Sequence, residues 1–326
     1  MLARIAITLV FAVAGTIYRI APARAADSYP QKPVHLIVAS SPGGNPDTYA
    51  RLMAHFLGER FGQQFVVEDR PGAGGNVGAD LVVKSVPDGY TILVGAGSIF
   101  SMNPHVYRAM SFDPFRDLAA VTLGVVASMW LVVHPSVPAR SVSELVALAK
   151  SRAQPLAYAS SGKGSIHHLT MEAFKRQAGV DFMHVPFKGA GQSVQALLAG
   201  EVPVAFVGYP AIESAVKAGR LRVLGFSMAK RSILTPDIPT VAESGVPGFD
   251  MAANVGVFVP AGTPRSVIQQ LSQGFNAALR EPHTLKRLTA IGLEPIGTTP
   301  EQAEKVLRAD SERDGVLSKR LELSAD

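Results

Sequence analysis

Short apolar runs alternate with amphipathic segments along almost the whole chain. The runs are four or five residues long and bounded by turn residues, which is typical of buried strands. Most adjoin a segment with apolar residues at helical spacing, such as Tyr49, Leu52 and Phe56 after the first run. This alternation predicts an α/β fold with parallel sheets and helices on both faces. The runs that we assign to strands are residues 36–39, 65–68, 91–95, 130–134, 156–160, 182–185, 204–207 and 221–225.

Cap residues locate the beginnings of several helices. Asn45 can cap a helix in which Pro46 fills the first position. Ser141 and Glu144 have the spacing of a capping box for a helix over residues 142–151. Three further helices are expected to begin at Ser165, at Thr263-Pro264 and at Thr299-Pro300.

The distribution of turn residues suggests two domains, one inserted into the other. Pro, Gly and polar residues are concentrated at residues 123–128 and 235–248, and no linker divides the chain into consecutive halves. We therefore expect one lobe of residues 26–127 plus 250–326 and an inserted lobe of residues 128–249. Two lobes joined by two crossings leave a cleft between them, which is a common location for a ligand.

The first residues are typical of an export signal. Arg4 precedes an uncharged stretch at residues 5–18, and Ala23-Arg24-Ala25 has the form of a cleavage site. We expect residues 1–25 to be a signal peptide that is cleaved near Ala25. An uncleaved N-terminal anchor is the alternative, although the stretch is short for a membrane span.

The charge balance gives no argument for a nucleic-acid partner. Removing the three arginines of residues 1–25 leaves 28 basic residues against 26 acidic ones, a net charge of +2. No run of Lys and Arg is interleaved with aromatic residues. The chain has no cysteine, which excludes disulfides and thiolate chemistry.

Three loops of small residues follow strands and could line the cleft. In open α/β sheets ligands bind beyond the carboxyl ends of strands, and helix N-termini attract anions. We expect the loops together to hold a small anion such as a carboxylate. For any one loop, close helix–strand packing is an equally good interpretation. The candidate residues in these loops are Ser41, Pro42, Gly43, Gly44 and Asp47, then Gly97 and Ser98, then Ser160, Ser161, Gly162, Lys163, Gly164 and Ser165.

Motifs for catalysis, nucleotides and metals are incomplete. Gly162-Lys163-Gly164-Ser165 lacks the first glycine of a phosphate loop, because Ala157 stands there. Residues 72–78 place the third glycine of a dinucleotide fingerprint one residue late. His167 and His168 are adjacent, so on a helix they point in different directions. We expect no cofactor, no metal and no catalytic residues. An exported enzyme for a small phosphorylated or carboxylated substrate, and an interaction protein with a vestigial cleft, are the alternatives.

Several segments match a known family in order along the chain. The most specific is Val67-Glu68-Asp69-Arg70-Pro71-Gly72-Ala73-Gly74-Gly75-Asn76-Val77-Gly78-Ala79. The other matching segments are residues 29–34, 42–51, 87–91, 158–162, 184–189, 236–243 and 260–264. On these residues the chain resembles the periplasmic substrate-binding proteins of tripartite tricarboxylate transporters, the Bug family.

The resemblance implies a type II periplasmic-binding fold, in which two α/β lobes with mixed, mostly parallel sheets close on a small carboxylated solute. It implies ligand contacts from the loop at residues 41–47, from Gly97 and Ser98, and from residues 160–165 with His168. It also implies a monomeric periplasmic protein that is not an enzyme. Its partners would be membrane transporter subunits or a sensor.

Three further candidate pocket residues differ from the usual residues of the family. Relatives usually carry an Asp or Asn after the strand at residues 204–207, where this chain has Gly208 and Tyr209. A tryptophan is common where this chain has Asn254. Tyr209 offers a stacking surface, so the sequence leaves both aliphatic and aromatic acids open as ligands.

Overall fold

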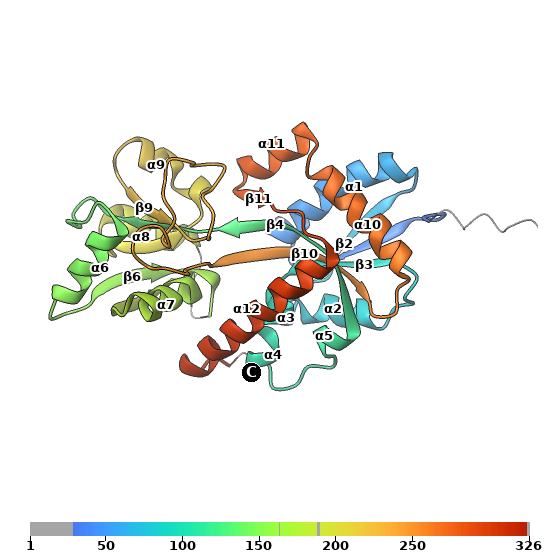
Figure 1. Cartoon of the computed structure of the whole chain (residues 1–326), viewed down its shortest axis with the longest axis horizontal. Coiled ribbons are helices and arrows are strands. Elements are labelled where there is room, and N and C mark those ends of the chain that lie inside the picture. The colour runs from blue at the N-terminus through green and yellow to red at the C-terminus, as the bar shows by residue number, and fades with distance from the viewer. Residues whose placement is uncertain (1–28, 163, 188–189, 325–326) are drawn as a thin grey trace, which may run out of the picture.

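The computed structural model describes residues 29–162, 164–187 and 190–324, and Figure 1 shows two β-sheets at opposite ends of an elongated molecule. We call the unit around the six-stranded sheet lobe 1 and the unit around the five-stranded sheet lobe 2. The strands of lobe 1, in spatial order, are β11 (Leu293–Pro295), β4 (Leu118–Ser128), β10 (Ala252–Pro260), β3 (Thr91–Ala96), β1 (Val34–Val38) and β2 (Phe65–Asp69). Those of lobe 2 are β7 (Phe182–Pro186), β6 (Leu156–Ser160), β8 (Val204–Val207), β5 (Trp130–Val133) and β9 (Arg222–Phe226).

Helices cover both faces of each sheet. In lobe 1, alternate residues of β1 face opposite cores: Leu36 packs with Met53 of α1 (Asn45–Phe61), whereas Ile37 packs with Val82 of α2 (Asn76–Val83). In lobe 2, Phe206 packs with Phe174 of α7 (Ile166–Ala178) on one side of the sheet. The helices of lobe 1 are α1 (Asn45–Phe61), η1 (Ala73–Gly75), α2 (Asn76–Val83), α3 (Ser98–Ser101), α4 (Asn103–Val106), α5 (Pro114–Asp117), α10 (Arg265–Ala278), α11 (Pro282–Ala290) and α12 (Pro300–Arg320). Those of lobe 2 are α6 (Val142–Ser151), α7 (Ile166–Ala178), α8 (Ala190–Ala199), η2 (Tyr209–Ala211) and α9 (Glu213–Lys217).

The α/β architecture with helices on both faces is confirmed, and both sheets are mixed. All eight runs assigned from the sequence are strands, with ends within two residues of the expected ones. β1 is parallel to β2 and β3, and β6 is parallel to β7 and β8. The antiparallel pairings involve β4, β10 and β11 in lobe 1 and β5 in lobe 2. The sheets are therefore less parallel than the alternation alone predicts.

Two helix starts and one loop differ from expectation. Gly44, not Asn45, occupies the N-cap of α1, and the Asp47 side chain bonds back to the Gly43 N–H instead. α10 begins at Arg265, because the Thr263 hydroxyl donates to the Pro260 carbonyl within a turn. The caps at Ser141 and Ser165 and the capping box at Thr299 are confirmed. The box expected at Ser141 is incomplete, because Glu144 Oε2 accepts the Arg140 N–H instead of the Ser141 N–H. The stretch at residues 123–128, interpreted as a turn-rich crossing, lies within β4.

The chain passes between the lobes at Met129 and again at Met251, and Ser227 joins these two crossings. The Met129 N–H donates to Ser227 Oγ at 3.0 Å, and Ser227 Oγ donates to the Met251 carbonyl at 2.6 Å. The backbone of Ser227 adds a bond to each crossing, at 2.9 Å to Met129 O and 2.8 Å from Met251 N. All three residues are buried. The two crossings are therefore held as one unit.

Two further elements link the lobes on either side of the crossings. Buried Glu294 of β11 accepts hydrogen bonds from Ser232 Oγ at 2.7 Å and from the Ile233 N–H at 3.1 Å. Helix α12 runs from lobe 1 towards lobe 2 (Figure 1), with Leu307 in a lobe 1 core and Leu317 in a lobe 2 core. Among the described helices, none is long and apolar enough to cross a membrane.

Replacing Ser227 with alanine (S227A) should lower the free energy of unfolding by about 1–3 kcal/mol, because two buried backbone groups lose a partner. Urea denaturation followed by circular dichroism measures this change. S151A is the matched control: Ser151 is exposed, and its hydroxyl contacts only Leu148 O among the described bonds. The control should stay within about 0.5 kcal/mol of wild type. Equal effects of the two substitutions would contradict the role of Ser227.

Candidate functional site

The loop at residues 41–47 joins β1 to α1 and is folded by Asp47. The buried Asp47 carboxylate accepts the Gly43 N–H at 2.8 Å through Oδ2, and the Gly44 N–H donates to Ser41 O at 3.1 Å. Gly43 has a φ of 79°, which favours glycine, and nothing lies within 4 Å of where its Cβ would be. Residues 41–43, including Pro42, are exposed. Asp47 therefore shapes the loop, while the small residues form its open surface.

Arg51 ties this loop to the next strand. Its Nε lies 2.7 Å from Asp47 Oδ1, and its other guanidinium nitrogen lies 2.8 Å from Asp69 Oδ2. Burial raises the pKa of Asp69, the neighbouring Asp47 raises it further, and Arg51 opposes both. The arginine thus holds two like charges together at the start of α1.

Gly97 and Asn254 lie side by side where β3 ends. The Gly97 N–H donates to Asn254 O at 2.8 Å, and a Cβ on Gly97 would stand 3.2 Å from the Asn254 Cβ. Ser98 begins the short helix α3 and is half-buried. The sequence-predicted Gly97, Ser98 and Asn254 therefore form one continuous patch.

Three histidines hold the loop at residues 160–165. His184 Nε2 lies 2.6 Å from Ser160 Oγ, and His167 Nδ1 lies 2.7 Å from Ser161 Oγ. The Gly164 N–H donates to His168 Nδ1 at 3.0 Å. Ser165 caps α7 through the His168 N–H, whereas Lys163 lies outside the described residues.

These histidines rest on a buried polar network. The rings of His168 and His184 stack at 4.1 Å, and Tyr158 stacks on His184 at 4.9 Å. The Tyr158 hydroxyl donates to Glu172 at 2.8 Å, and Lys175 pairs with the same carboxylate at 2.9 Å. Burial lowers the pKa of His184, which Glu172 opposes and Lys175 reinforces. The buried network of Tyr158, Glu172 and Lys175 therefore holds the histidines that fix the loop.

The two serines of the loop have different roles. Ser160 is fully buried, and its oxygen also exchanges bonds with both the N–H and the carbonyl of Gly162 at 3.1 Å. Ser161 is half-buried, and His167 is its one side-chain partner among the described bonds. Ser161 therefore keeps hydrogen-bonding capacity for a ligand, whereas Ser160 is used within the loop.

Gly208 and Tyr209 follow β8, which is parallel to β6, so they lie at the same edge of the sheet as the loop at residues 160–165. The Tyr209 ring packs 5.3 Å from that of buried Trp130, at 43°. Nothing lies within 4 Å of where a Gly208 Cβ would be. The next residue, Pro210, contacts the position that a Cβ on Gly292 of lobe 1 would occupy, at 2.8 Å. One face of the Tyr209 ring is thus already covered by Trp130.

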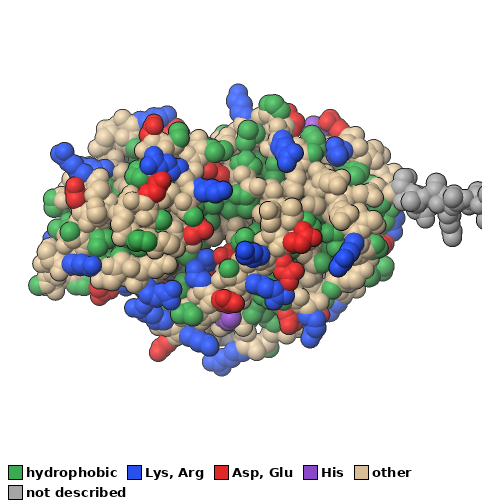
Figure 2. Space-filling model, viewed as in Figure 1, with side chains coloured by type: hydrophobic (Ala, Val, Ile, Leu, Met, Phe, Trp, Pro, Cys, Tyr) green, Lys and Arg blue, Asp and Glu red, His purple; other side chains and the backbone are tan. Residues whose placement is uncertain are grey.

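A cavity of about 590 Å³ lies between the lobes, and Figure 2 shows a hollow between the two ends of the molecule. It brings together four of the sequence-predicted residues: Gly97, Ser98, Asn254 and, from lobe 2, Gly164. The other described candidates do not line it. These are Ser41, Pro42, Gly43, Gly44, Asp47, Ser160, Ser161, Gly162, Ser165, His168, Gly208 and Tyr209.

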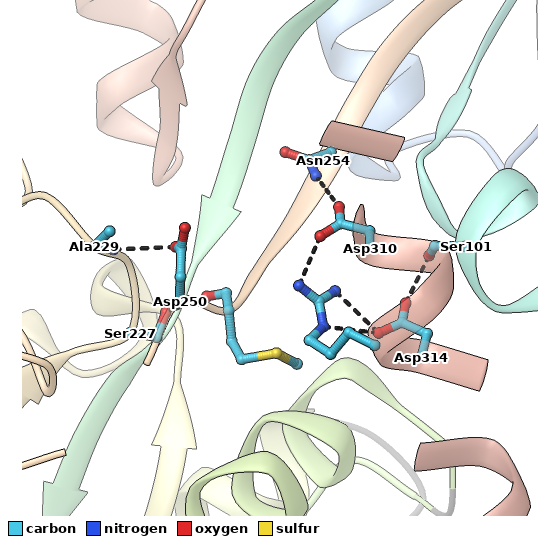
Figure 3. Close-up of polar contacts among 9 residues, drawn as sticks. Ser101, Ser227, Ala229, Asp250, Asn254, Asp310 and Asp314 are labelled. Atoms are coloured by element: carbon cyan, nitrogen blue, oxygen red, sulfur yellow. Dashed lines mark hydrogen bonds and ion pairs between the residues drawn. The ribbon is translucent and has the colours of Figure 1, made fainter. Parts of the chain in front are cut away.

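The cavity has a charged wall on α12 that was not predicted from the sequence (Figure 3). Arg313 pairs with Asp310 at 2.6 Å and with Asp314 at 2.9 Å. Asp310 also accepts from Asn254 Nδ2 at 2.8 Å, and Asp314 accepts from Ser101 Oγ at 2.6 Å. Burial raises the pKa of Asp310, against the effect of Arg313. None of these three charged residues was a candidate from the sequence. A signal was present, because the charges share a face with apolar positions 307 and 317.

Within the described ranges, no group of three or more His, Asp or Glu side chains could hold a metal ion. The chemistry on offer is instead hydrogen bonding. Hydroxyls and glycine-rich backbone stand at the N-terminal ends of α1 and α7, and of these residues Gly164 lines the cavity between the lobes. Such groups suit the recognition of an anion.

Comparisons with known proteins give one matching family and several similar proteins. A family described as tripartite tricarboxylate transporter family receptor matches residues 49–323. Protein BugT of Bordetella pertussis is 33% identical over 289 residues, covering 88% of this chain and 89% of that protein. A protein of R. palustris solved with adipate superimposes with a TM-score of 0.71 at 35% identity, covering 91% of this chain and 99% of that one. MatC from Rhodopseudomonas palustris with bound malate gives 0.65 at 28% identity, covering 90% and 100%.

Replacing Asp47 with alanine (D47A) should lower the free energy of unfolding by about 1–3 kcal/mol, because the Gly43 N–H and Arg51 lose their partner. The pKa of Asp69 should fall, because a neighbouring negative charge that raises it is removed. Urea denaturation and NMR titration of the carboxyl groups measure the two effects. D237A, at an exposed carboxylate, is the control for stability. An Asp69 pKa that rises in D47A would contradict this description of the pair.

Proposed function

The chain belongs to the tripartite tricarboxylate transporter family of receptors, and we propose that it captures a carboxylate in the cleft between its two lobes. Members of this family are periplasmic solute-binding proteins and not enzymes. The R. palustris relative was solved with adipate and MatC with malate. The observation that carries the proposal is the loop at residues 160–165, which leaves the Ser161 hydroxyl available at the N-terminal end of α7.

The two lobes would act as the two halves of a clamp. We assign residues 26–127 plus 250–326 to one half and residues 128–249 to the other. Sheet membership supports these limits, except that Ser128 is the last residue of β4 in lobe 1. An open form would close around the acid because only the closed form offers it donors from both halves. From lobe 1 these donors would come from the loop at residues 41–47 and from Ser98. From lobe 2 they would come from Ser161 and its neighbours.

The site residues divide by their contacts. Asp47, Ser160 and His168 would fix the shapes of their loops, because their polar atoms are used internally. Gly97 and Asn254 would support the wall near the cavity. The residues that we assign to direct contact with the acid are Ser41, Pro42, Gly43, Gly44, Ser98, Ser161, Gly162, Gly164 and Ser165, with Gly208 and Tyr209 on the rim.

Export and partners complete the proposal. Residues 1–25 have the pattern of a signal peptide, which would deliver the mature chain to the periplasm. There it would act as a monomer and pass its solute to membrane transporter subunits, or report it to a sensor. No element of the proposal requires a cofactor or a nucleic acid.

Binding should be specific for ionised acids. Adipate, malate and benzoate are titrated into the chain lacking residues 1–25, and fluorescence of Trp130 and of the tyrosines follows binding. S161A should weaken the affinity about 10- to 100-fold, because a hydrogen bond to a charged group contributes about 1.5–3 kcal/mol. S151A should bind like wild type. Binding of the aliphatic acids alone would exclude a stacking role for Tyr209, whereas no binding of any acid would contradict the proposed function.

Closure should be visible as compaction. Small-angle X-ray scattering of the same chain should give a smaller radius of gyration when a bound acid is saturating, because the closed form brings the lobes together. D237A serves as a control that should close like wild type. An acid that binds without any change in the scattering profile would contradict closure while leaving carboxylate binding intact.

A further inference from the structure

His167 contacts the hydroxyl that the loop leaves for a ligand. It is the second residue of α7, and its Nδ1 lies 2.7 Å from Ser161 Oγ. Both side chains belong to half-buried residues. The hydrogen bond that Ser161 can still make therefore depends on whether its hydroxyl donates to His167 or accepts from it.

The tautomer and the charge of the His167 ring decide which hydrogen bond Ser161 can offer a ligand. When Nδ1 is unprotonated it accepts the serine hydrogen, and the hydroxyl presents only lone pairs, which repel a carboxylate. When His167 is an imidazolium, its Nδ1–H donates to Ser161 Oγ. The hydroxyl hydrogen is then free to be donated to a carboxylate. The neutral tautomer with its hydrogen on Nδ1 frees the same hydroxyl hydrogen. The imidazolium differs from it by the positive charge that a bound carboxylate stabilises.

We propose that carboxylate capture by this protein is linked to the uptake of a proton by His167, with Ser161 as the relay between the imidazolium and the acid. The inference rests on the proposed carboxylate-binding function of the cleft. It makes His167 a positioning residue. It also explains discrimination at this site, because a neutral amide analogue of the acid would not stabilise the imidazolium.

The other two histidines that contact the loop, His168 and His184, hold its shape without carrying a charge. His168 Nδ1 accepts the Gly164 N–H, so a proton on that nitrogen would break the bond. His184 contacts Ser160, which is fully buried and already bonded within the loop. Only the contact of His167 with Ser161 survives protonation and also changes what a ligand meets.

The surroundings of His167 keep it neutral until an acid arrives. Burial lowers its pKa below the ordinary value of 6.5, and the positive end of α7 acts in the same direction. The charged groups of this region, Glu172 and Lys175 on α7, act on His184 of β7, whereas at His167 burial is the cause among the described residues. A bound carboxylate raises the pKa again. Affinity therefore rises as pH falls from the pKa of the complex towards that of the free protein.

Calorimetry tests the linkage directly. Adipate, malate and benzoate are each titrated into the chain lacking residues 1–25, in buffers of different ionisation enthalpy between about pH 6 and 8. Wild type should take up a fraction of one proton, and its affinity should rise by at most about tenfold per unit fall in pH. H167N, whose amide can donate to Ser161 at every pH, should bind without proton uptake and without this pH dependence. H55N removes a histidine whose side chain is 80% exposed on α1, and should match wild type.

Each outcome decides between the proposals. An acid that binds wild type without proton uptake, or equal uptake by H167N and wild type, would overturn the linkage and leave the proposed function standing. Binding of none of the three acids at any pH would contradict the proposed function, and the linkage with it. Should H167N not fold, NMR titration of wild-type histidines with and without a bound acid decides instead. A rise in the pKa of His167 on binding supports the linkage, and an unchanged pKa refutes it.

Discussion

Ser227 makes four hydrogen bonds at the place where both chain crossings pass between the lobes. Its hydroxyl and its backbone serve Met129 on one crossing and Met251 on the other, in a site that excludes water. Buried backbone groups cannot exchange these partners for solvent, so the two crossings cannot slide past one another without a large cost. Any rotation of the lobes therefore has to change the backbone torsions of residues that flank Met129, Ser227 and Met251. Every arrangement of the two sets of loops across the cleft depends on this fixed point.

The loops of the cleft divide their polar groups between shape and recognition. In lobe 1, the Asp47 carboxylate takes the Gly43 N–H and leaves the small residues open. In lobe 2, His184 and His168 fix the loop, and the stacked rings rest on Tyr158 and its carboxylate partner. Preorganisation of this kind spares the ligand the entropy of ordering the loops. As a consequence, few polar groups of the loops remain for binding, so it matters whether the Ser161 hydroxyl is able to donate a hydrogen bond.

The strands of the parallel units and the helix caps could be predicted from local patterns, because a buried run between turn residues needs no distant partner to be recognised. β4 and β10 could not. Gly124 interrupts the apolar pattern of β4, and it is required because the Tyr49 ring fills the space of a Cβ. β10 finds its partner more than a hundred residues away, where Gly256 lies opposite Leu123. The loop at residues 160–165 was predicted from the sequence, but the role of Ser160 depends on His184, which comes from another strand.

The charged wall on α12 shows most clearly what sequence patterns leave open. A helix with Asp310, Arg313 and Asp314 has the composition of a solvated face. Its burial also requires hydrogen bonds to the two carboxylates from Asn254 and Ser101, which come from distant elements. With two carboxylates for one guanidinium, the cluster carries a net negative charge beside the cavity. A carboxylate is disfavoured there and favoured at the N-terminal ends of α1 and α7, where backbone dipoles present positive charge. The cleft is therefore electrostatically asymmetric, and this asymmetry favours an anion at the glycine-rich loops over an anion beside the charged wall.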